Sequence, residues 1–415
     1  MTIKSLIALA FVTLLSACGS ANPTTNPLPN PPGGVNPGGG GTTPPATGQC
    51  ANTLSRDITV PSRLANGPAA CDYLLTGFVY IKSLLVIEPG VVVKADKDAV
   101  IWIEGGDQIA AGTANARITL EGFSPLQGYW DGINISTRAG EVRLEYVDIK
   151  DAGQTCATSG CRPAALSGFG GGQVTLRNSS ISNSFVNGAI LEGWLVGFSD
   201  NRFYNNRWHG LVIDADRVGL LDKPSDYVGG VQPNGLAGIR LFGASQVTRP
   251  VTWKKLGAPY FLSSYVEVSS VLTLEPGVKL IGDGGWLDID VGGTLLAIGT
   301  AAEPIEFTGI TQTPGAWDGI QFSVYNTGRD NRLEYVKLSY GGGARSELVT
   351  NGLITNYSAG IYIANSSIQH SSRWGISCSD PDAALVKLGP NNSFGDNAFG
   401  DVDPDCNPIT AATAN

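Results

Sequence analysis

The stretch Leu85-Val86-Ile87-Glu88-Pro89-Gly90-Val91 returns later in the chain as Leu272-Thr273-Leu274-Glu275-Pro276-Gly277-Val278. Three further segments return at the offset that separates Glu88 from Glu275: 111–114 at 298–301, 130–133 at 317–320, and 178–181 at 365–368. Leu144-Glu145-Tyr146-Val147 returns as Leu333-Glu334-Tyr335-Val336 at a slightly larger offset, which a two-residue insertion explains. Matches at one offset over so much of the chain indicate a tandem duplication.

Each copy contains short apolar stretches separated by Gly, Asn, Asp or Pro. In the first copy we expect strands at 58–60, 79–81, 91–93, 100–103, 118–120, 133–135, 144–147, 174–176, 189–191 and 211–213. Such spacing fits either a sandwich of hairpins or a parallel solenoid. Two-residue Asn-Gly and Asp-Gly turns are scarce, which favours the solenoid. Coils of about 22 residues would give about 15 coils in about 350 residues.

Composition supports an all-β body and restricts the partners. The chain has 55 Gly and 24 Pro, and only 15% of its residues are charged, which is typical of many short strands with tight turns. The formal net charge is −9, and Lys and Arg form no cluster. Nucleic acid and anionic lipid headgroups both need a basic footprint, so we expect neither as the main partner.

The N-terminus carries an export signal. A roughly ten-residue apolar run at 6–15 is too short for a membrane span, which needs about 20 residues. The tetrapeptide Leu15-Ser16-Ala17-Cys18 that ends the signal resembles a bacterial lipobox, which implies lipidation of Cys18. An ordinary signal peptide with a chance cysteine is the alternative. Gly19, where an Asp would resemble an inner-membrane retention signal, favours the outer membrane and leaves the membrane face open.

Residues 19–49 (GSANPTTNPLPNPPGGVNPGGGGTTPPATGQ) contain almost nothing that could pack in a core, so we expect a tether. The expected organisation is a signal peptide over 1–17, a lipidated Pro/Gly-rich tether over 18–49, a first copy over 50–240, and a second copy with a C-terminal cap over 241–415. The lipid would anchor the chain to a membrane without spanning it.

The cysteines fit an oxidising compartment. Removing Cys18 from the seven leaves six, an even number that suggests disulfides. Fifteen connectivities exist in principle, and we expect the sequence-local pairs Cys50–Cys71, Cys156–Cys161 and Cys378–Cys406. A zinc site is the rival interpretation, which the absence of a nearby His or second Cys pair at Cys156 and Cys161 disfavours.

With these motifs in order, the sequence resembles bacterial right-handed parallel β-helix proteins, in the branch with the pattern "LT-EPG-V … GT---PI-FTG … W-GI … L-YV". The second copy matches best, at residues 272–278, 299–309, 317–320 and 333–336. The resemblance covers most of residues 57–400 and implies an internally duplicated, right-handed parallel β-helix. It is weak for function, because this architecture carries lyases, hydrolases, adhesins and plain surface proteins alike.

The repeated carboxylates are candidates for chemistry. They are Asp131 and Asp318 in Trp-Asp-Gly-Ile, Glu145 and Glu334 in Leu-Glu-Tyr-Val, and Glu88 and Glu275 beside Pro-Gly. An active site built once does not require this symmetry, so we expect them to cap turns or stack coils. We predict no catalytic, cofactor-binding or metal-binding residue. Calcium would enter only with a polysaccharide lyase, whose relatives on this fold hold it with clustered carboxylates.

A weaker candidate site surrounds His209. The Trp-His-Gly at 208–210, followed by Asp214 and Asp216, echoes the histidine element of related hydrolases. No adjacent Asp pair precedes it and no Arg-x-Lys follows, so a corner histidine is the default expectation. His370, the only other histidine, aligns with Asn183 of the first copy, which suggests a tolerant polar corner.

Four tryptophans sit in repeated contexts: Trp130, Trp208, Trp317 and Trp374. We expect packing between coils, with a sugar-stacking face as the alternative. The sequence as a whole predicts a lipid-anchored envelope solenoid with a structural, adhesive or ligand-presenting role, meeting a polysaccharide or another envelope protein. The rivals are a polysaccharide lyase or glycoside hydrolase, and an accessory subunit of an outer-membrane or surface-layer assembly.

Overall fold

The computed structural model describes residues 50–154, 162–168, 172–193, 195–324, 326, 330–343, 352–379, 385–406 and 409–410. All of them belong to one compact unit that spans residues 45–415. No helix among these residues is long and apolar enough to cross a membrane. Strands dominate the unit, and its two helices in the described ranges are short 3-10 turns, η1 (Ala215–Leu220) and η2 (Pro404–Cys406).

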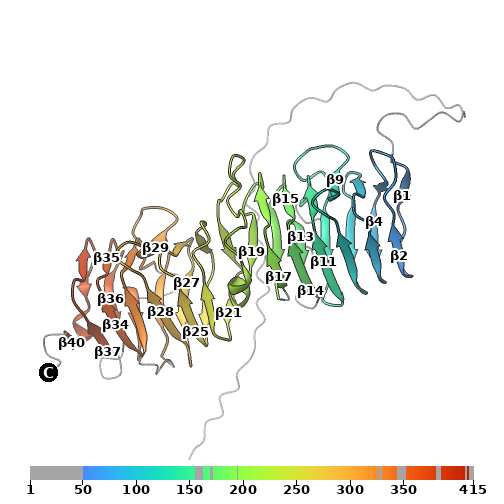
Figure 1. Cartoon of the computed structure of the whole chain (residues 1–415). Helices are drawn as coiled ribbons and strands as arrows, with labels where there is room; N and C mark the ends of the chain where they lie inside the picture. The colour runs from blue at the N-terminus through green and yellow to red at the C-terminus, as the bar shows by residue number, and fades with distance from the viewer. Residues whose placement is uncertain are drawn as a thin grey trace, which may run out of the picture. The chain divides into compact units, whose positions relative to one another are not determined.

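The protein is a parallel β-helix: each strand pairs in parallel with strands of neighbouring coils, so that the coils stack in chain order from β1 to β40 (Figure 1). We name its five sheets A to E. Sheet A consists of β1 (Asn52–Leu54), β3 (Tyr73–Leu75), β6 (Val92–Ala95), β9 (Ile118–Gly122), β12 (Val147–Lys150), β15 (Ser180–Ser182) and β18 (Arg202–Tyr204). Sheet C consists of β2 (Ser62–Leu64), β5 (Leu85–Ile87), β8 (Gln108–Ala111), β11 (Glu141–Glu145), β14 (Gln173–Arg177) and β17 (Leu195–Ser199).

Sheet B runs through both copies with 13 strands: β4 (Phe78–Ile81), β7 (Val100–Ile103), β10 (Gly132–Ile135), β13 (Ala164–Gly168), β16 (Asn187–Leu191), β19 (Leu211–Ile213), β20 (Ile239–Leu241), β23 (Tyr260–Leu262), β26 (Lys279–Gly282), β29 (Ile305–Gly309), β32 (Val336–Ser339), β35 (Ser367–Gln369) and β38 (Ser393–Gly395). The expected 15 coils are too many, because long loops lengthen some coils. For example, β9 begins at Ile118, and β12, the next strand of its sheet, begins only at Val147.

Two further sheets belong to the second copy alone. Sheet D consists of β21 (Ser245–Val247), β24 (Val266–Val268), β27 (Trp286–Ile289), β30 (Gly319–Phe322), β33 (Gly352–Asn356), β36 (Trp374–Cys378) and β39 (Gly400–Val402). Sheet E consists of β22 (Val251–Trp253), β25 (Val271–Leu274), β28 (Thr294–Ile298), β31 (Asn331–Glu334), β34 (Gly360–Ala364), β37 (Leu385–Leu388) and β40 (Ile409–Thr410).

Alternation along each strand places the core inside the coils. In β9, Ile118 and Leu120 are buried, whereas Thr119 and Glu121 point outward and stay half-buried. The inward side chains stack from coil to coil into one continuous hydrophobic core that runs from Leu54 to Cys406. Burying each Leu or Ile contributes about 1.5–3 kcal/mol, so the stability rises with every added coil.

Equivalent strands of the two copies lie on different faces of the coils. By the duplication offset β20 is the counterpart of β1, yet β1 belongs to sheet A and β20 pairs with β19 in sheet B. The shift persists throughout: strands of sheet A correspond to strands of sheet B, those of B to D, and those of C to E. With three faces to a coil, the second copy is rotated by one face relative to the first.

The linking segment 214–238 produces this rotation. After β19, η1 packs against β17, β21 and β22 and occupies the face that sheet C would continue. Asp226 then bridges to Arg202 of β18 and occupies the face of sheet A. The link therefore fills two faces of a coil, and β20 is left to add to sheet B.

The corners between sheets explain the repeated motifs. The segment 144–147, expected as one strand, bends at Tyr146, whose φ of 51° is left-handed, and joins sheet C to sheet A. Tyr335 does the same in the second copy with a φ of 50°. The expected strand 58–60 is also wrong, because Ile58 forms an isolated bridge to Ile81 and its neighbours belong to no strand.

Polar residues hold the left-handed corners, as the sequence predicted. Asn178, Asn183 and Asn365 have φ values of 50°, 57° and 52°. His370 stands where Asn183 stands in the first copy and has a φ of 56°. Asn tolerates this conformation better than most residues, and the histidine shows that the corner accepts another polar side chain.

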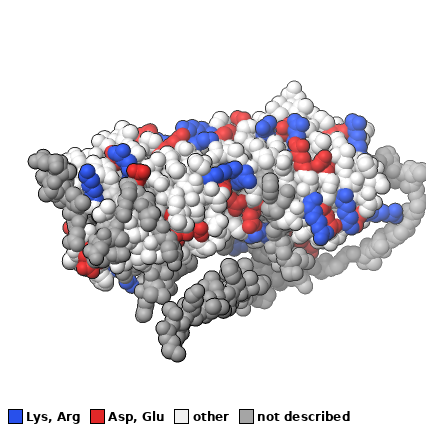
Figure 2. All heavy atoms as spheres, turned by 90° about the horizontal axis from the view of Figure 1, so that it is seen from below, with Lys and Arg blue, Asp and Glu red and all other residues white. Residues whose placement is uncertain are grey.

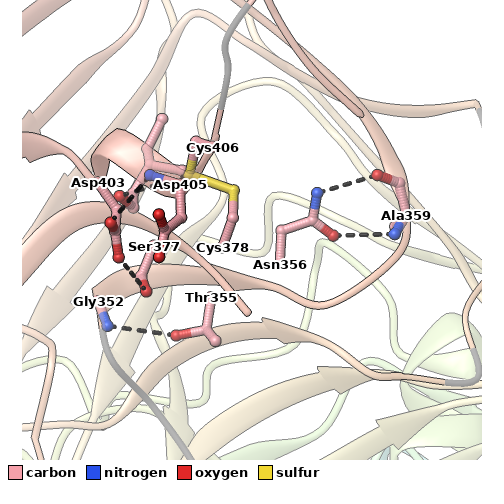
Figure 3. Close-up of a disulfide and its surroundings, with 10 residues drawn as sticks. Gly352, Thr355, Asn356, Ala359, Ser377, Cys378, Asp403, Asp405 and Cys406 are labelled. Carbon is pink, nitrogen blue, oxygen red and sulfur yellow. Dashed lines mark hydrogen bonds between the residues drawn. A yellow bond between two sulfur atoms is a disulfide. The ribbon is translucent and has the colours of Figure 1, made fainter. Parts of the chain in front are cut away.

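Disulfides lie at both ends of the solenoid. Cys50 bonds Cys71, and Cys378 bonds Cys406, as expected. Figure 3 shows the C-terminal bond, beside which Ser377 donates a hydrogen bond to Asp403 at 3.2 Å. Each bond ties a terminal segment to the next coil. The expected Cys156–Cys161 pair and Cys18 lie outside the described residues.

Candidate functional site

A stack of three left-handed corners forms the most structured recess on the first copy. Tyr146, Asn178 and Asp200 have φ values of 51°, 50° and 56° and follow β11, β14 and β17 in successive coils. They therefore line the corner between sheets C and A. In the second copy Tyr335, Asn365 and Asn391 form the same stack, between sheets E and B.

Buried serines hold both stacks in the same way. The Ser179 hydroxyl accepts a hydrogen bond from the Val147 amide at 3.0 Å and donates to the Arg177 carbonyl at 2.7 Å. The Ser366 hydroxyl likewise accepts from the Val336 amide at 3.0 Å and donates to the Ala364 carbonyl at 2.8 Å. The repeated Asn-Ser-Ser-Ile motif is thus a device for joining coils at a corner.

Each stack opens into a groove. The first-copy groove has a volume of about 440 Å³ and is lined by Arg117, Tyr146, Asp148, Lys150, Asn178, Ser179, Ser180, Asp200, Arg202 and Tyr204. The second-copy groove has a volume of about 390 Å³ and is lined by Thr300, Ala301, Ala302, Pro304, Tyr335, Val336, Lys337, Asn365, Ser366, Ser367, Asn391 and Ser393. The duplicated motifs therefore build two equivalent recesses.

The linings differ although the backbones agree. By the duplication offset and the strand register, Arg117 corresponds to Pro304, Asp148 to Lys337, Asp200 to Asn391, Arg202 to Ser393, and Tyr204 to Gly395. The first-copy groove is consequently rich in charge and aromatic rings. The second-copy groove is lined mainly by small, neutral side chains.

Asp148 fixes one side of the first-copy groove. Arg117 donates two hydrogen bonds of 2.7 and 2.8 Å to its carboxylate, and Ser180 donates a third. Burial acts to raise the pKa of Asp148, but these hydrogen bonds outweigh it and hold the pKa below its ordinary value. An aspartate held ionised in this way serves as a fixed acceptor and is a poor proton donor.

Arg202 and Tyr204 form the other side of the groove. The Arg202 guanidinium lies 5.1 Å from the centre of the Tyr204 ring. Arg202 is exposed and forms no ion pair with any described residue. Lys150, which lies on β12 together with Asp148, pairs with Glu121 at 3.3 Å. An arginine stacked on a ring keeps its hydrogen-bond donors available for a ligand.

Sequence reasoning did not single out Arg117, Arg202 or Tyr204, because they lie in no repeated motif. A position-by-position comparison of the two copies would have found them. These three residues are charged or aromatic and differ from their counterparts in the second copy, although they lie close to motifs that are the same in both copies.

His209, the weak histidine candidate, is buried. Its side chain is 2% exposed and meets the edge of Phe261 with 4.8 Å between ring centres. Burial first, and Arg240 second, lower the pKa of His209 to about 4, so the ring is neutral near pH 7. Its Nδ1 has no hydrogen-bond partner among the described residues. The residue is closed to a substrate in this arrangement.

Asp214 and Asp216 do not join His209. They follow β19, whereas His209 precedes it, and an extended chain from residue 209 to residue 214 spans roughly 16 Å. Asp214 accepts a hydrogen bond from the Gly193 amide, and Asp216 accepts one from the Thr248 amide at 2.8 Å. Both carboxylates hold loops at the junction of the two copies.

Asp216 also lines a junction groove of about 570 Å³, together with Leu195, Val196, Arg217, Gly219, Leu220, Arg249, Pro250, Val251, Thr252 and Lys254. Two of its three cations donate hydrogen bonds to backbone carbonyls. Lys254 donates to the carbonyls of Gly219 and Leu221 at 2.8 and 2.9 Å, and Arg249 donates to the Asp216 carbonyl at 3.0 Å. Over the described ranges, no three His, Cys, Asp or Glu side chains gather as a metal site would require.

The repeated glutamates pair with neighbouring cations or cap turns. Glu145 lies 2.7 Å from Arg143, and Glu334 lies 2.5 Å from Arg332. Glu88 and Glu275 each accept a hydrogen bond at 3.0 Å from an amide of the preceding coil. Figure 2 shows basic and acidic side chains lying in small mixed groups on the face it displays.

The two aspartates of Trp-Asp-Gly-Ile differ in burial. Asp131 is half-buried, and burial first, with Asp98 second, raises its pKa to about 6. Asp318 is 3% exposed. Each occurs once per copy.

The four repeated tryptophans form no common face. Trp130 and Trp317 are 1% exposed, and each indole donates to a carbonyl of the next coil, at 2.8 and 2.9 Å. Trp208 is 48% exposed, whereas Trp374 packs against the edge of Phe399. Two of the four therefore hold coils together.

Comparisons with protein-family models, with curated proteins and with solved structures find no match to this chain.

Proposed function

We propose that the chain is an exported lipoprotein, anchored through Cys18, whose β-helix binds an extracytoplasmic ligand and holds it at the cell envelope. The lipobox-like tetrapeptide at 15–18 and the Pro/Gly-rich tether at 18–49 support the anchor. The proposal is an adhesive or ligand-presenting role, with the outer membrane as the site of anchoring.

The first-copy groove carries the binding role. It has the same scaffold as the second-copy groove, but Arg117, Arg202 and Tyr204 line it where small, uncharged residues stand in the second copy. Because the scaffold is shared, the corner does not need these residues for folding. A recess with an exposed Arg202 beside Tyr204, in which no described carboxylate pairs with the arginine, is suited to binding.

The test compares two forms of the chain from residue 18 onward, both carrying Cys18→Ser, so that neither has the lipid or the apolar run at 6–15. One also carries Arg202→Ser and Tyr204→Gly, which place at these two positions the residues that stand at the equivalent positions of the second copy. We expect the unaltered groove to retain at least one of alginate, polygalacturonate, dextran and mannan, and the altered groove to bind it at least about tenfold more weakly. Equal binding by both forms, or none by either, contradicts the proposal.

Two further readouts complete the test. In cells that express the whole chain, labelled fatty acid should enter the form with Cys18 and not the Cys18→Ser form. The rival function, a polysaccharide lyase or hydrolase, predicts unsaturated products or new reducing ends from the same samples, with or without calcium. Turnover would replace the binding role.

A further inference from the structure

Exposed aromatic side chains cluster on the outer face of sheet B near its first strands. Phe78 is 40% exposed, and Tyr80 and Trp102 are half-buried. The ring centre of Phe78 lies 4.8 Å from that of Tyr80 and 6.0 Å from that of Trp102, with 28° between the Phe78 and Trp102 planes. We call these three residues the first platform.

A second platform lies at the matching place of the second copy, on the outer face of sheet D. Tyr265 corresponds to Phe78 by the duplication offset. Its ring stacks on Trp286 of the next coil, with 5.1 Å between centres and 27° between planes. Both copies thus present a stacked, half-exposed pair of rings, although the residues themselves have changed.

Acceptor groups border both platforms. Glu267 and Asp288 face outward on neighbouring strands beside the Tyr265–Trp286 pair, and no described Lys or Arg pairs with either carboxylate. Gln321 follows on the next coil, where its side-chain nitrogen donates a hydrogen bond of 3.4 Å to Asp288. At the first platform, Lys82 lies between two carboxylates.

This combination selects the chemistry of the ligand. Aromatic faces pack against apolar rings, while carboxylate and amide oxygens accept hydrogen bonds from hydroxyl groups. Sugar rings offer an apolar face and hydroxyls at once. The carboxylates of the second platform oppose a polyanion, and at the first platform Lys82 and Arg138 only balance Asp57 and Glu104, so the fitting ligand is an uncharged polysaccharide. Successive coils rise by about 4.8 Å, close to the length of one sugar unit.

The one-face rotation between the copies separates the platforms. Seven strand-to-strand steps of sheet B, from β4 to β23, place them about 34 Å apart along the solenoid. Sheets B and D are neighbouring faces of a three-faced coil, so one straight chain cannot lie on both. We infer that the two platforms bind separate uncharged polysaccharide chains and that the protein thereby cross-links them.

This inference rests on the proposed binding role but uses other surfaces, and variants separate the two. The chain from residue 18 onward, carrying Cys18→Ser, is mixed with dextran, mannan, a soluble β-glucan or alginate. We expect retardation by an uncharged polymer in affinity electrophoresis, and light scattering that rises and then falls as the ratio of polymer to protein increases. That maximum is the signature of bridging by a two-site protein.

Single-platform variants sharpen the test. Phe78→Leu and Trp286→Leu should each retain binding, about tenfold or more weakened through lost avidity, and abolish the scattering maximum. The double variant should lose retardation. The matched control is Trp208→Leu, which removes an exposed tryptophan that belongs to neither platform. It should behave as the parent chain.

Several results overturn the inference. The first is a scattering maximum that persists in a single-platform variant. The second is a preference for alginate over every uncharged polymer, and the third is the absence of any interaction with the polymers tested. Arg202→Ser alters the first-copy groove and neither platform. It therefore tests the proposed function and should leave the bridging of polysaccharide chains intact. Loss of bridging there would assign the polymer to the groove. Circular dichroism of each variant confirms that the β-structure is retained.

Discussion

Asp288 carries a carboxyl group that its surroundings make costly to ionise. Burial on the outer face of sheet D, followed by Asp290 and Glu267, raises its pKa to about 6, against a smaller opposing effect of the Gln321 hydrogen bond. Because this folded-state pKa exceeds the value in an unfolded chain, the folded protein binds the proton more tightly. The ionised group therefore costs stability above pH 6, and that cost disappears as the pH falls below about 4.

We predict that Asp288→Asn raises the free energy of unfolding near pH 7.5 by on the order of 1–2 kcal/mol and leaves it unchanged near pH 3.5. Urea denaturation at the two pH values measures this. Glu141→Gln, on an exposed side chain, controls for the loss of one negative charge. A variant less stable than the parent at the higher pH would show that the carboxylate stabilises the fold.

Among the elements, the corners depend on a ladder of buried asparagines. Asn201 accepts a hydrogen bond from the Ser179 amide at 3.0 Å and donates one to the Leu176 carbonyl at 2.8 Å. Asn206 makes the same two kinds of bond with Ser184 and Ile181. These side chains supply the bonds that the backbone cannot make where a strand turns into the next.

Asn201→Ala should leave a buried N–H and a buried carbonyl without partners, at a cost on the order of 2–4 kcal/mol. Thermal unfolding followed by circular dichroism measures the loss. Asn115→Ala, on an exposed turn, is the matched control and should change stability by less than about 0.5 kcal/mol. Equal small effects would mean that water satisfies the corner groups.

The terminal coils rely on their disulfides, because within the described residues each pairs with a neighbouring coil on one side. Breaking Cys50–Cys71 or Cys378–Cys406, with Cys71→Ser or Cys378→Ser, should cost about 2–4 kcal/mol in the free energy of unfolding. Hydrogen exchange should quicken first in the strands of the affected end. A double variant should respond less than the parent to added reductant. Unchanged exchange at both ends would contradict this role.

For the whole molecule, the rotation of one copy relative to the other is the feature with most consequence. In sheet B, Val212 pairs with Arg240 across the junction. Stacking of like faces would instead place β20 against β18 of sheet A. The rotation decides where each duplicated surface points, and hence whether equivalent sites act on one ligand or on two.

Paired cysteines test the junction. Val212→Cys with Arg240→Cys should form a disulfide on mild oxidation, because adjacent strands bring the two Cα atoms within the bonding range of about 4.4–6.8 Å. Tyr204→Cys with Arg240→Cys should remain reduced. Mass spectrometry of the digested protein identifies the linked peptides. The reverse pattern would show that the copies stack like face on like face.

Local patterns of the sequence determined much of this architecture. The duplication, the short strands and the disulfides Cys50–Cys71 and Cys378–Cys406 follow from repeats, alternation and cysteine spacing. The polar corners also follow, because few residues other than Gly tolerate a left-handed φ, and Asn is among them. The misplaced strand 144–147 shows the limit, since an apolar run does not reveal where Tyr146 turns the chain.

Only the tertiary structure decided which surfaces meet. The link 214–238 rotates the second copy because η1 and Asp226 fill two faces of a coil. No pattern of residues in the link reveals how many faces it occupies. The first-copy groove likewise joins Arg117, Asp148 and Arg202 from three different coils. A sequence specifies strands through local alternation, but stacking in three dimensions sets which distant residues lie side by side.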